Sequence, residues 1–133
     1  MRIRYILNND KRVSTFNTFI KTEYPTLLTE KKPDIFLIAG GDGTMLRAIH
    51  DTIDEKIPYL GKAMGTFNFL LNSFDNDKDV IDKILNDEIK LHTFKSHAIK
   101  AMFNGKKIGE SVNDVILGEK ITGYHSFSLS TKN

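Results

Sequence analysis

The chain has 133 residues, a charged share of 27% and a formal net charge of +2. This length is enough for a domain with a core of its own, whereas a charge so close to neutral gives no electrostatic case for a nucleic-acid partner. The chain has no cysteine, which excludes a disulfide framework, a thiolate metal site and a cysteine nucleophile, and which fits a reducing cytoplasm.

The first predicted elements are a strand and a helix. Apolar residues alternate with other side chains from Ile3 to Leu7, which predicts a strand. Further apolar residues recur at helical spacing, so we expect an amphipathic helix from Lys11 to about Tyr24, which Pro25 ends. The N-terminus lacks the apolar core of a signal peptide and no run approaches membrane-spanning length, so we expect a cytoplasmic protein without membrane contact.

A central strand is predicted over residues 34–39, DIFLIA. A continuous apolar run of this kind is typical of a strand that is buried on both faces, as in a parallel sheet. Glycines between Gly40 and Gly43 break the run, and apolar residues at helical spacing follow from Met45 to Ile53. The predicted order is therefore strand, glycine loop and helix.

Strands and helices continue to alternate up to about residue 95. We expect a strand from Ile57 to Met64, a loop from Gly65 to Asp75 and a helix from about Asp77 to Asn86. This alternation predicts an open α/β sheet within a domain that covers residues 1–95.

The remaining residues, 96–133, show no helical pattern. Strands are expected at 98–103, within 106–117 and at 124–129, with a tight turn at Asn104-Gly105. The sequence thus predicts an incomplete β-rich segment after the α/β domain.

The segment Gly40-Gly41-Asp42-Gly43-Thr44 is a candidate phosphate site. Glycine lets the backbone turn sharply and approach a phosphate, and the following helix offers unpaired N–H groups and the positive end of its dipole. Together these suit a pyrophosphate or a triphosphate. Because an acid in such a loop repels phosphate, Asp42 needs a role of its own: to hold Mg²⁺, to bind a sugar hydroxyl or to take a proton from one.

The same five residues also suit a plain strand-to-helix connection with Asp42 as a turn or cap residue. Their spacing matches neither the Walker pattern nor the dinucleotide G-x-G-x-x-G pattern. No pair of histidines has the i, i+4 spacing of a helical metal site, and the acids between Asp75 and Asp82 lack EF-hand spacing. We therefore expect no metal site built from protein ligands alone.

Residues 34–50, DIFLIAGGDGTMLRAIH, resemble the signature of NAD kinases. The stretch from Pro58 to Leu70 is similar to the second loop of that family, although Asn68 replaces the usual glycine and the segment 62–64 departs from the common pattern. Residues 113–117, NDVIL, are similar to the Asn-Glu motif of the family, with Asp114 in place of the glutamate. The resemblance extends in order over nearly the whole chain.

The resemblance implies an α/β fold with a Rossmann-like, open, three-layer N-terminal domain, followed by the start of a β-rich, NAD-binding domain. It also implies that the γ-phosphoryl group of ATP, or of polyphosphate, passes to the 2′-hydroxyl of the adenosine ribose of NAD, with Mg²⁺ as the divalent metal and NADP as the product. Asp42 would be the general base. The residues that would bind the nucleotides are Gly41, Gly43, Thr44, Arg47, Phe69, Asn113 and Asp114.

Two other functions stay open. Residues 65–68, GTFN, resemble the Gly-Thr-Gly-Asn of lipid kinases, which suggests a diacylglycerol kinase-like enzyme, and a non-catalytic nucleotide-binding module is the other alternative. NAD kinases are longer than this chain, and the Thr-Ala-Tyr-like motif of their second half does not occur here. We therefore expect weak or absent activity in the chain alone, and either a homo-oligomer or a second chain that supplies the missing half. The other partners expected are small-molecule nucleotides.

Overall fold

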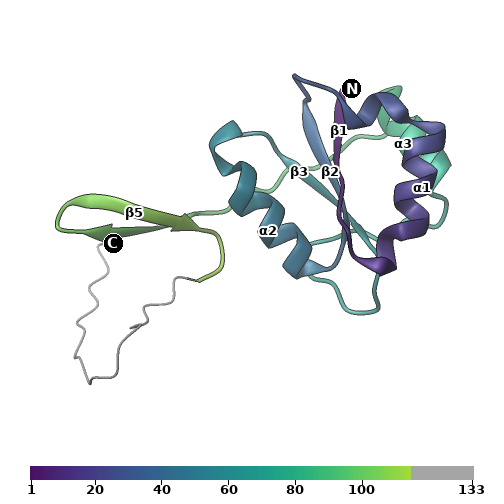
Figure 1. The fold of residues 1–133 in the computed structure, drawn as a ribbon. Helices are drawn as coiled ribbons and strands as arrows, with labels where there is room; N and C mark the ends of the chain where they lie inside the picture. The colour runs from purple at the N-terminus through teal and green to yellow at the C-terminus, as the bar shows by residue number, and fades with distance from the viewer. Residues whose placement is uncertain (115–133) are drawn as a thin grey trace.

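The computed structural model describes residues 1–114 and shows a mixed α/β fold (Figure 1). Its strands are β1 Ile3–Ile6, β2 Ile35–Gly40, β3 Tyr59–Ala63, β4 Ile99–Phe103 and β5 Lys106–Ser111. Its α-helices are α1 Ser14–Glu23, α2 Asp42–Thr52 and α3 Asp77–Leu85. Short 3-10 helices are η1 Lys11–Val13, η2 Pro25–Leu28 and η3 Ile53–Glu55.

The first three strands form a parallel sheet in the order β1-β2-β3. Ile3 pairs with Ile35 at one side of β2, and Leu37 pairs with Leu60 at the other. All six residues of β2 are buried, because this strand lies in the middle and helices cover both faces. The prediction of a parallel sheet around a continuous apolar strand is therefore confirmed.

Helices cover the two faces of this sheet unequally. One apolar cluster joins Phe16 and Ile20 of α1 and Ile81 and Ile84 of α3 to the strands. A smaller cluster joins α2 to the opposite face through Met45, Ala48 and the strand residue Ile38. Figure 1 shows the same division, with α2 on one side of the strands and α1 and α3 on the other.

Short polar side chains cap the 3-10 helix η1 and the helix α3. The Asp10 carboxylate accepts a hydrogen bond from Arg12 N (2.9 Å), and the Asn76 side chain accepts one from Asp79 N (3.2 Å). Both residues stand just before the first helical turn, where N–H groups lack partners within the helix. The helix expected from Lys11 to about Tyr24 is present, but its first turn is the 3-10 helix η1.

An ion pair fastens the start of β1 to the start of β2. Arg2 donates to the Asp34 carboxylate from its guanidinium (Nη2–Oδ1, 2.7 Å) and from its backbone N–H (N–Oδ2, 2.9 Å). These hydrogen bonds, from the side chain first and the backbone second, lower the pKa of Asp34 to about 2. The carboxylate is therefore more stable in the folded chain than in the unfolded one.

This shift predicts an acid dependence of the folding stability. We expect Asp34→Asn to lower the free energy of unfolding at pH 7, and we expect the difference from the wild type to disappear in acid. An unfolded aspartate has a pKa of about 3.9, so the pair stabilises the fold above pH of about 4 and loses its effect as the pH falls through about 2. Urea unfolding at a series of pH values measures the difference, with the exposed Asp51→Asn as the matched control. A difference that stays constant over this range would contradict the assignment.

Strands β4 and β5 form an antiparallel hairpin that extends to one side of the sheet (Figure 1). Its turn is the expected Asn104-Gly105, with φ of 47° and 76°. Large apolar side chains on it are exposed: Ile99, Met102, Phe103 and Ile108. The strand predicted at 124–129, and residues 115–117 of the NDVIL segment, lie outside the described residues, so the β-rich character of the whole segment 96–133 stays a prediction.

No helix in residues 1–114 combines the length and the apolar character that a bilayer-spanning segment requires.

Candidate functional site

The topology places the glycine segment where parallel sheets commonly bind ligands. Strand β1 leads to α1 on one face of the sheet, whereas its neighbour β2 leads to α2 on the opposite face. In open parallel sheets, ligands bind outside the carboxyl ends of two such strands, at the point where the connections diverge. Gly40 and Gly41 stand at the carboxyl end of β2, and Asn8 follows the end of β1.

The glycine turn is shorter than the sequence suggested. Helix α2 begins at Asp42, so Asp42, Gly43 and Thr44 form its first turn, and only Gly40 and Gly41 connect it to the strand. The Thr44 and Met45 N–H groups already donate to the Gly41 carbonyl (3.0 and 3.2 Å). The earlier expectation of a loop through Gly43 is thus wrong in its extent, because the helix closes its first turn on Gly41.

Gly40 and Gly43 differ in what an added side chain would contact. At Gly40 φ is +156°, and an added Cβ would lie 2.6 Å from Thr44 Oγ1, so the fold itself excludes a side chain there. At Gly43 an added Cβ would meet no atom within 4 Å. Nothing in residues 1–114 therefore requires Gly43 to lack a side chain, and the space beside it is free for a ligand.

The Asp42 side chain is half-buried and bridges α2 to the loop after β3. Its Oδ1 accepts hydrogen bonds from the N–H groups of Phe69 (3.1 Å) and Leu70 (2.9 Å), and its Oδ2 lies 3.0 Å from the same Phe69 nitrogen. A carboxylate oxygen has two lone pairs, so Oδ2 keeps one that the described residues do not use. The carboxylate is not sealed in the core, and it can accept a further donor.

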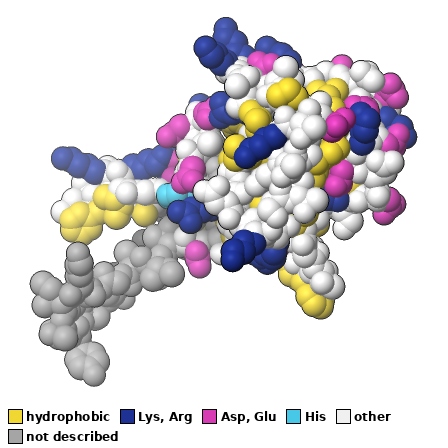
Figure 2. Space-filling view, turned by 45° about the vertical axis from the view of Figure 1, so that its right-hand side comes forward, with side chains coloured by type: hydrophobic (Ala, Val, Ile, Leu, Met, Phe, Trp, Pro, Cys, Tyr) yellow, Lys and Arg dark blue, Asp and Glu magenta, His cyan; other side chains and the backbone are white. Residues whose placement is uncertain are grey.

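The loop that reaches Asp42 displays aromatic side chains to solvent. Phe67 is 88% exposed and Phe69 is 93% exposed, so neither ring belongs to the apolar core. Figure 2 shows hydrophobic side chains projecting at the lower end of the α/β part, where Figure 1 places this loop. Exposed aromatic rings beside the glycine turn are suited to stack on a nucleobase.

One side-chain oxygen of this loop lacks a partner. The Asn68 Oδ1 atom is buried and has no hydrogen bond within the described residues, although the Asn68 Nδ2 atom donates to Gly65 O (2.6 Å). Oδ1 lies 3.7 Å from the point where a Cβ on Gly41 would stand. An unpaired acceptor next to the glycine turn suits a hydroxyl donor on a bound ligand.

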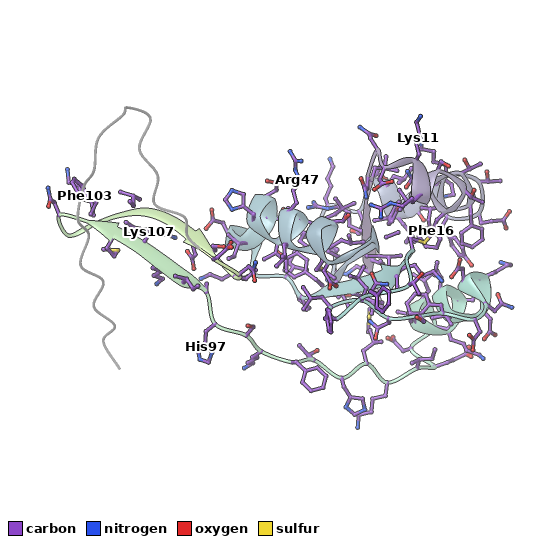
Figure 3. All side chains as sticks on the ribbon, turned by 90° about the horizontal axis from the view of Figure 1, so that it is seen from below. Lys11, Phe16, Arg47, His97, Phe103 and Lys107 are labelled. Carbon is purple, nitrogen blue, oxygen red and sulfur yellow. The ribbon has the colours of Figure 1, made fainter. Side chains whose placement is uncertain are left out.

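A second group of predicted residues gathers farther along α2. Arg47, Asn113 and Asp114 line one cavity of about 250 Å³. The other residues that line it are Leu46, Ile49, His50, Ile53, Ser111 and Val112. Arg47 projects from α2 into solvent (Figure 3). It lies five residues after Asp42, about 8 Å along the helix axis, so the structure groups the predicted residues into two neighbouring clusters rather than one.

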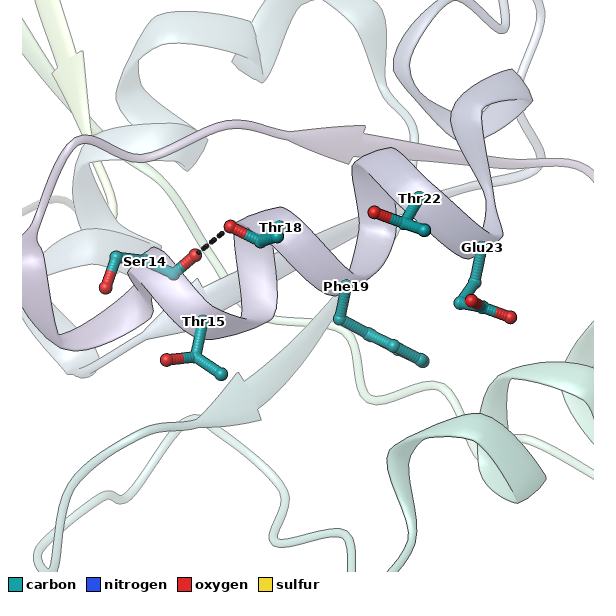
Figure 4. Close-up of a pocket in the computed structure, with 6 residues that line it drawn as sticks. All are labelled: Ser14, Thr15, Thr18, Phe19, Thr22 and Glu23. Carbon is teal, nitrogen blue, oxygen red and sulfur yellow. Dashed lines mark hydrogen bonds between the residues drawn. The ribbon is translucent and has the colours of Figure 1, made fainter.

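A larger hollow, of about 540 Å³, lies along α1 and contains none of the predicted residues (Figure 4). It is lined by Ser14, Thr15, Thr18, Phe19, Thr22 and Glu23. The Thr18 hydroxyl is used within the helix, where it donates to Ser14 O (3.0 Å). This surface has no connection to the glycine turn.

The metal expected with ATP needs no large set of protein ligands. Residues 1–114 contain no group of three or more His, Asp or Glu side chains that could hold an ion. Mg²⁺ commonly uses one or two carboxylates together with the phosphates of its substrate. Asp42 is the carboxylate at the glycine turn that could take such a part.

Sequence reasoning missed three contributors to the site: the Leu70 N–H, the ring of Phe67 and the side chain of Asn68. For Asn68 the available signal was its departure from the family pattern, where glycine is usual. No sequence signal indicated the hydrogen bond from the Leu70 N–H to the Asp42 carboxylate, since the two residues are 28 positions apart.

Residues 3–89 match the family model described as the ATP-NAD kinase N-terminal domain. Curated NAD kinases are similar to the chain. That of Methanopyrus kandleri is 29% identical over 97 residues, which cover 70% of this chain and 34% of the relative. That of Sulfurisphaera tokodaii is 35% identical over 75 residues (54% and 29%), and that of Rickettsia bellii is 32% identical over 74 residues (56% and 29%). The matched part of the chain thus spans about a third of the length of these relatives.

Proposed function

The chain belongs to the NAD kinase family, and from this premise we propose that it binds NAD and serves the transfer of a phosphoryl group from ATP to NAD. The acceptor is the 2′-hydroxyl of the adenosine ribose and the product is NADP. The observation that carries the proposal is the Asp42 carboxylate, which stands half-exposed between a glycine turn and an exposed phenylalanine, with a lone pair of Oδ2 unused.

In the proposed reaction, Asp42 Oδ2 accepts the proton of the 2′-hydroxyl while the ribose oxygen forms a bond to the γ-phosphorus. The bond between that phosphorus and the bridging oxygen breaks, and ADP leaves with the electron pair. Phosphoryl transfer depends mainly on alignment and charge neutralisation. The Phe69 and Leu70 N–H groups contribute alignment, because they fix the orientation of the Asp42 carboxylate.

The remaining predicted residues have proposed roles that follow their positions. Gly43 leaves the space in which a phosphate can approach the first turn of α2. Thr44 lies in the same turn, and Phe69 offers its ring to the adenine. Arg47, together with Asn113 and Asp114 in the adjoining cavity, is proposed to hold the part of the nucleotides that extends along α2. The same proposal includes three further expectations: a Rossmann-like, three-layer domain, polyphosphate as an alternative donor and a cytoplasmic location.

The activity of the chain alone is expected to be low, because the relatives it matches are about three times as long as the matched region. The residues of the described part supply the glycine turn and the proposed base. Other parts of the NAD site would come from a second chain, from a homo-oligomer or from further residues.

The proposal is tested by measuring NADP formation by the 133-residue chain with NAD, ATP and Mg²⁺, using an NADP-specific dehydrogenase as the detector, and by titrating NAD in a calorimeter. We expect measurable NAD binding and slow NADP formation. Binding of NAD and ATP without any NADP would favour the non-catalytic module. Phosphorylation of diacylglycerol in a parallel reaction, without binding of NAD, would favour a lipid kinase and contradict the proposal.

A further inference from the structure

Lys62 is the only buried charged side chain in residues 1–114, with 8% of its surface exposed. It lies near the carboxyl end of β3, and it pairs in register with Ala39 of β2. The glycine turn follows the carboxyl end of β2, so the two lie at the same end of the sheet. Removing an ammonium group from water is costly unless partners replace the water. The groups that contact the Lys62 ammonium therefore indicate the role of this buried charge.

Every polar contact of the Lys62 side chain goes to the end of the loop that follows β3. Its Nζ forms an ion pair with Asp77 Oδ1 (2.6 Å), donates to the Phe74 carbonyl (3.1 Å) and stands 5.2 Å from the centre of the Phe74 ring. The contact with Asp77 is an ion pair rather than an aligned hydrogen bond. Asp77 is the first residue of α3, so the charge fixes the point at which the loop enters that helix.

The same loop carries the groups that hold Asp42. It leaves β3 at Met64, whose N–H donates to Gly40 O (2.9 Å), and it returns beside the strand at Asn72, whose N–H donates to Gly61 O (2.8 Å). Phe69 and Leu70 lie between these two points and reach Asp42 with their N–H groups. The loop is thus held at its far side by Asp42 and at its exit by Lys62.

We propose that Lys62 is a positioning residue, which orders residues 64–76 so that Phe69 and Leu70 can orient the Asp42 carboxylate and present the Phe69 ring to NAD. An apolar side chain would fill the same place on the strand, but it could not bind the Phe74 carbonyl or Asp77. The effect on NAD rests on the proposed function, whereas the ordering of the loop does not.

The test compares four forms of the 133-residue chain: the wild type, Lys62→Met, Lys62→Arg and Lys78→Met. Methionine keeps the buried volume and removes the charge, and arginine keeps the charge and the donors. Lys78→Met is the matched control, because Lys78 forms an exposed ion pair with Asp82 within α3 (3.2 Å). Hydrogen exchange of the Phe69 and Leu70 amides reports the order of the loop, calorimetry with NAD reports binding, and thermal unfolding reports the fold.

We expect Lys62→Met to stay folded, because the Asp77 carboxylate that loses its partner has 33% of its side chain exposed and can be solvated by water. Exchange of the Phe69 and Leu70 amides should rise about tenfold, and the Kd for NAD should rise about tenfold. Lys62→Arg should restore both in large part, and Lys78→Met should change neither. A global loss of the fold in Lys62→Met with equal exchange at all amides would make Lys62 a structural residue and overturn the proposal.

Unchanged exchange at Phe69 and Leu70 would overturn the proposal as well, and so would faster exchange with unchanged NAD affinity. A wild type that does not bind NAD would contradict the proposed function, while the exchange rates would still decide whether Lys62 orders the loop.

Discussion

Asp42→Asn is expected to lower the rate of NADP formation by about 10²–10⁴-fold, the usual contribution of a general base. The amide cannot take the ribose proton, but its oxygen can still accept a hydrogen bond from the Phe69 or Leu70 N–H, so the loop should keep much of its position. The affinity for NAD should consequently change far less than the rate. Single-turnover reactions with the protein in excess over NAD measure the rate even when turnover is slow.

Asp51→Asn is the matched control for this experiment, because Asp51 is an exposed aspartate of the same helix. We expect it to leave both the rate and the Kd unchanged. Near-normal NADP formation by Asp42→Asn would exclude the general-base role. An equal loss of rate and of NAD affinity would instead make Asp42 a binding residue.

Gly40→Ala and Gly43→Ala are expected to have opposite effects, although the two positions are three residues apart. Alanine at position 40 needs a φ of +156° and places its Cβ 2.6 Å from Thr44 Oγ1. Backbone strain of this kind costs about 1–3 kcal/mol and overpacking costs about as much. We therefore expect a loss of about 2–5 kcal/mol in the free energy of unfolding for Gly40→Ala, measured by urea unfolding.

Alanine at position 43 meets no atom of the described residues and enters the first turn of a helix. Its stability should be unchanged or higher by up to about 1 kcal/mol, because alanine favours helix more than glycine does. Its Kd for NAD or ATP should nevertheless rise at least about tenfold, since the methyl group fills the space proposed for phosphate. If Gly43→Ala binds nucleotide as well as the wild type does, no phosphate approaches this turn.

The fold was predictable where the hydrophobic pattern of a short segment was strong. The run DIFLIA is apolar without alternation, and it is the fully buried central strand β2. The glycine segment also connects that strand to α2, as the sequence indicated. The start of α2 was misjudged, because glycines and an aspartate are poor helix formers by propensity, and here the Gly41 carbonyl accepts the first helical hydrogen bonds.

The site was predictable in its residues and less so in its arrangement. Asp42 and Phe69 were both named from the family pattern, yet their link through the Phe69 N–H depends on the path of a loop that no periodicity describes. The ion pair of Lys62 was hidden for a similar reason, since a lysine in a strand gives no sign of its burial. The roles of Arg47, Asn113 and Asp114 in binding stay predictions.

The order of the strands has a consequence for biosynthesis. All three strands of the parallel sheet come from the first 63 residues, and the helix that completes the main apolar cluster ends at Leu85. N-terminal units can fold while the ribosome is still adding later residues. The glycine turn, its aspartate and the loop that holds it can therefore be assembled while the β4–β5 hairpin is still inside the exit tunnel. A nascent chain whose first 91 residues have emerged from the tunnel should already resist proteolysis over this part.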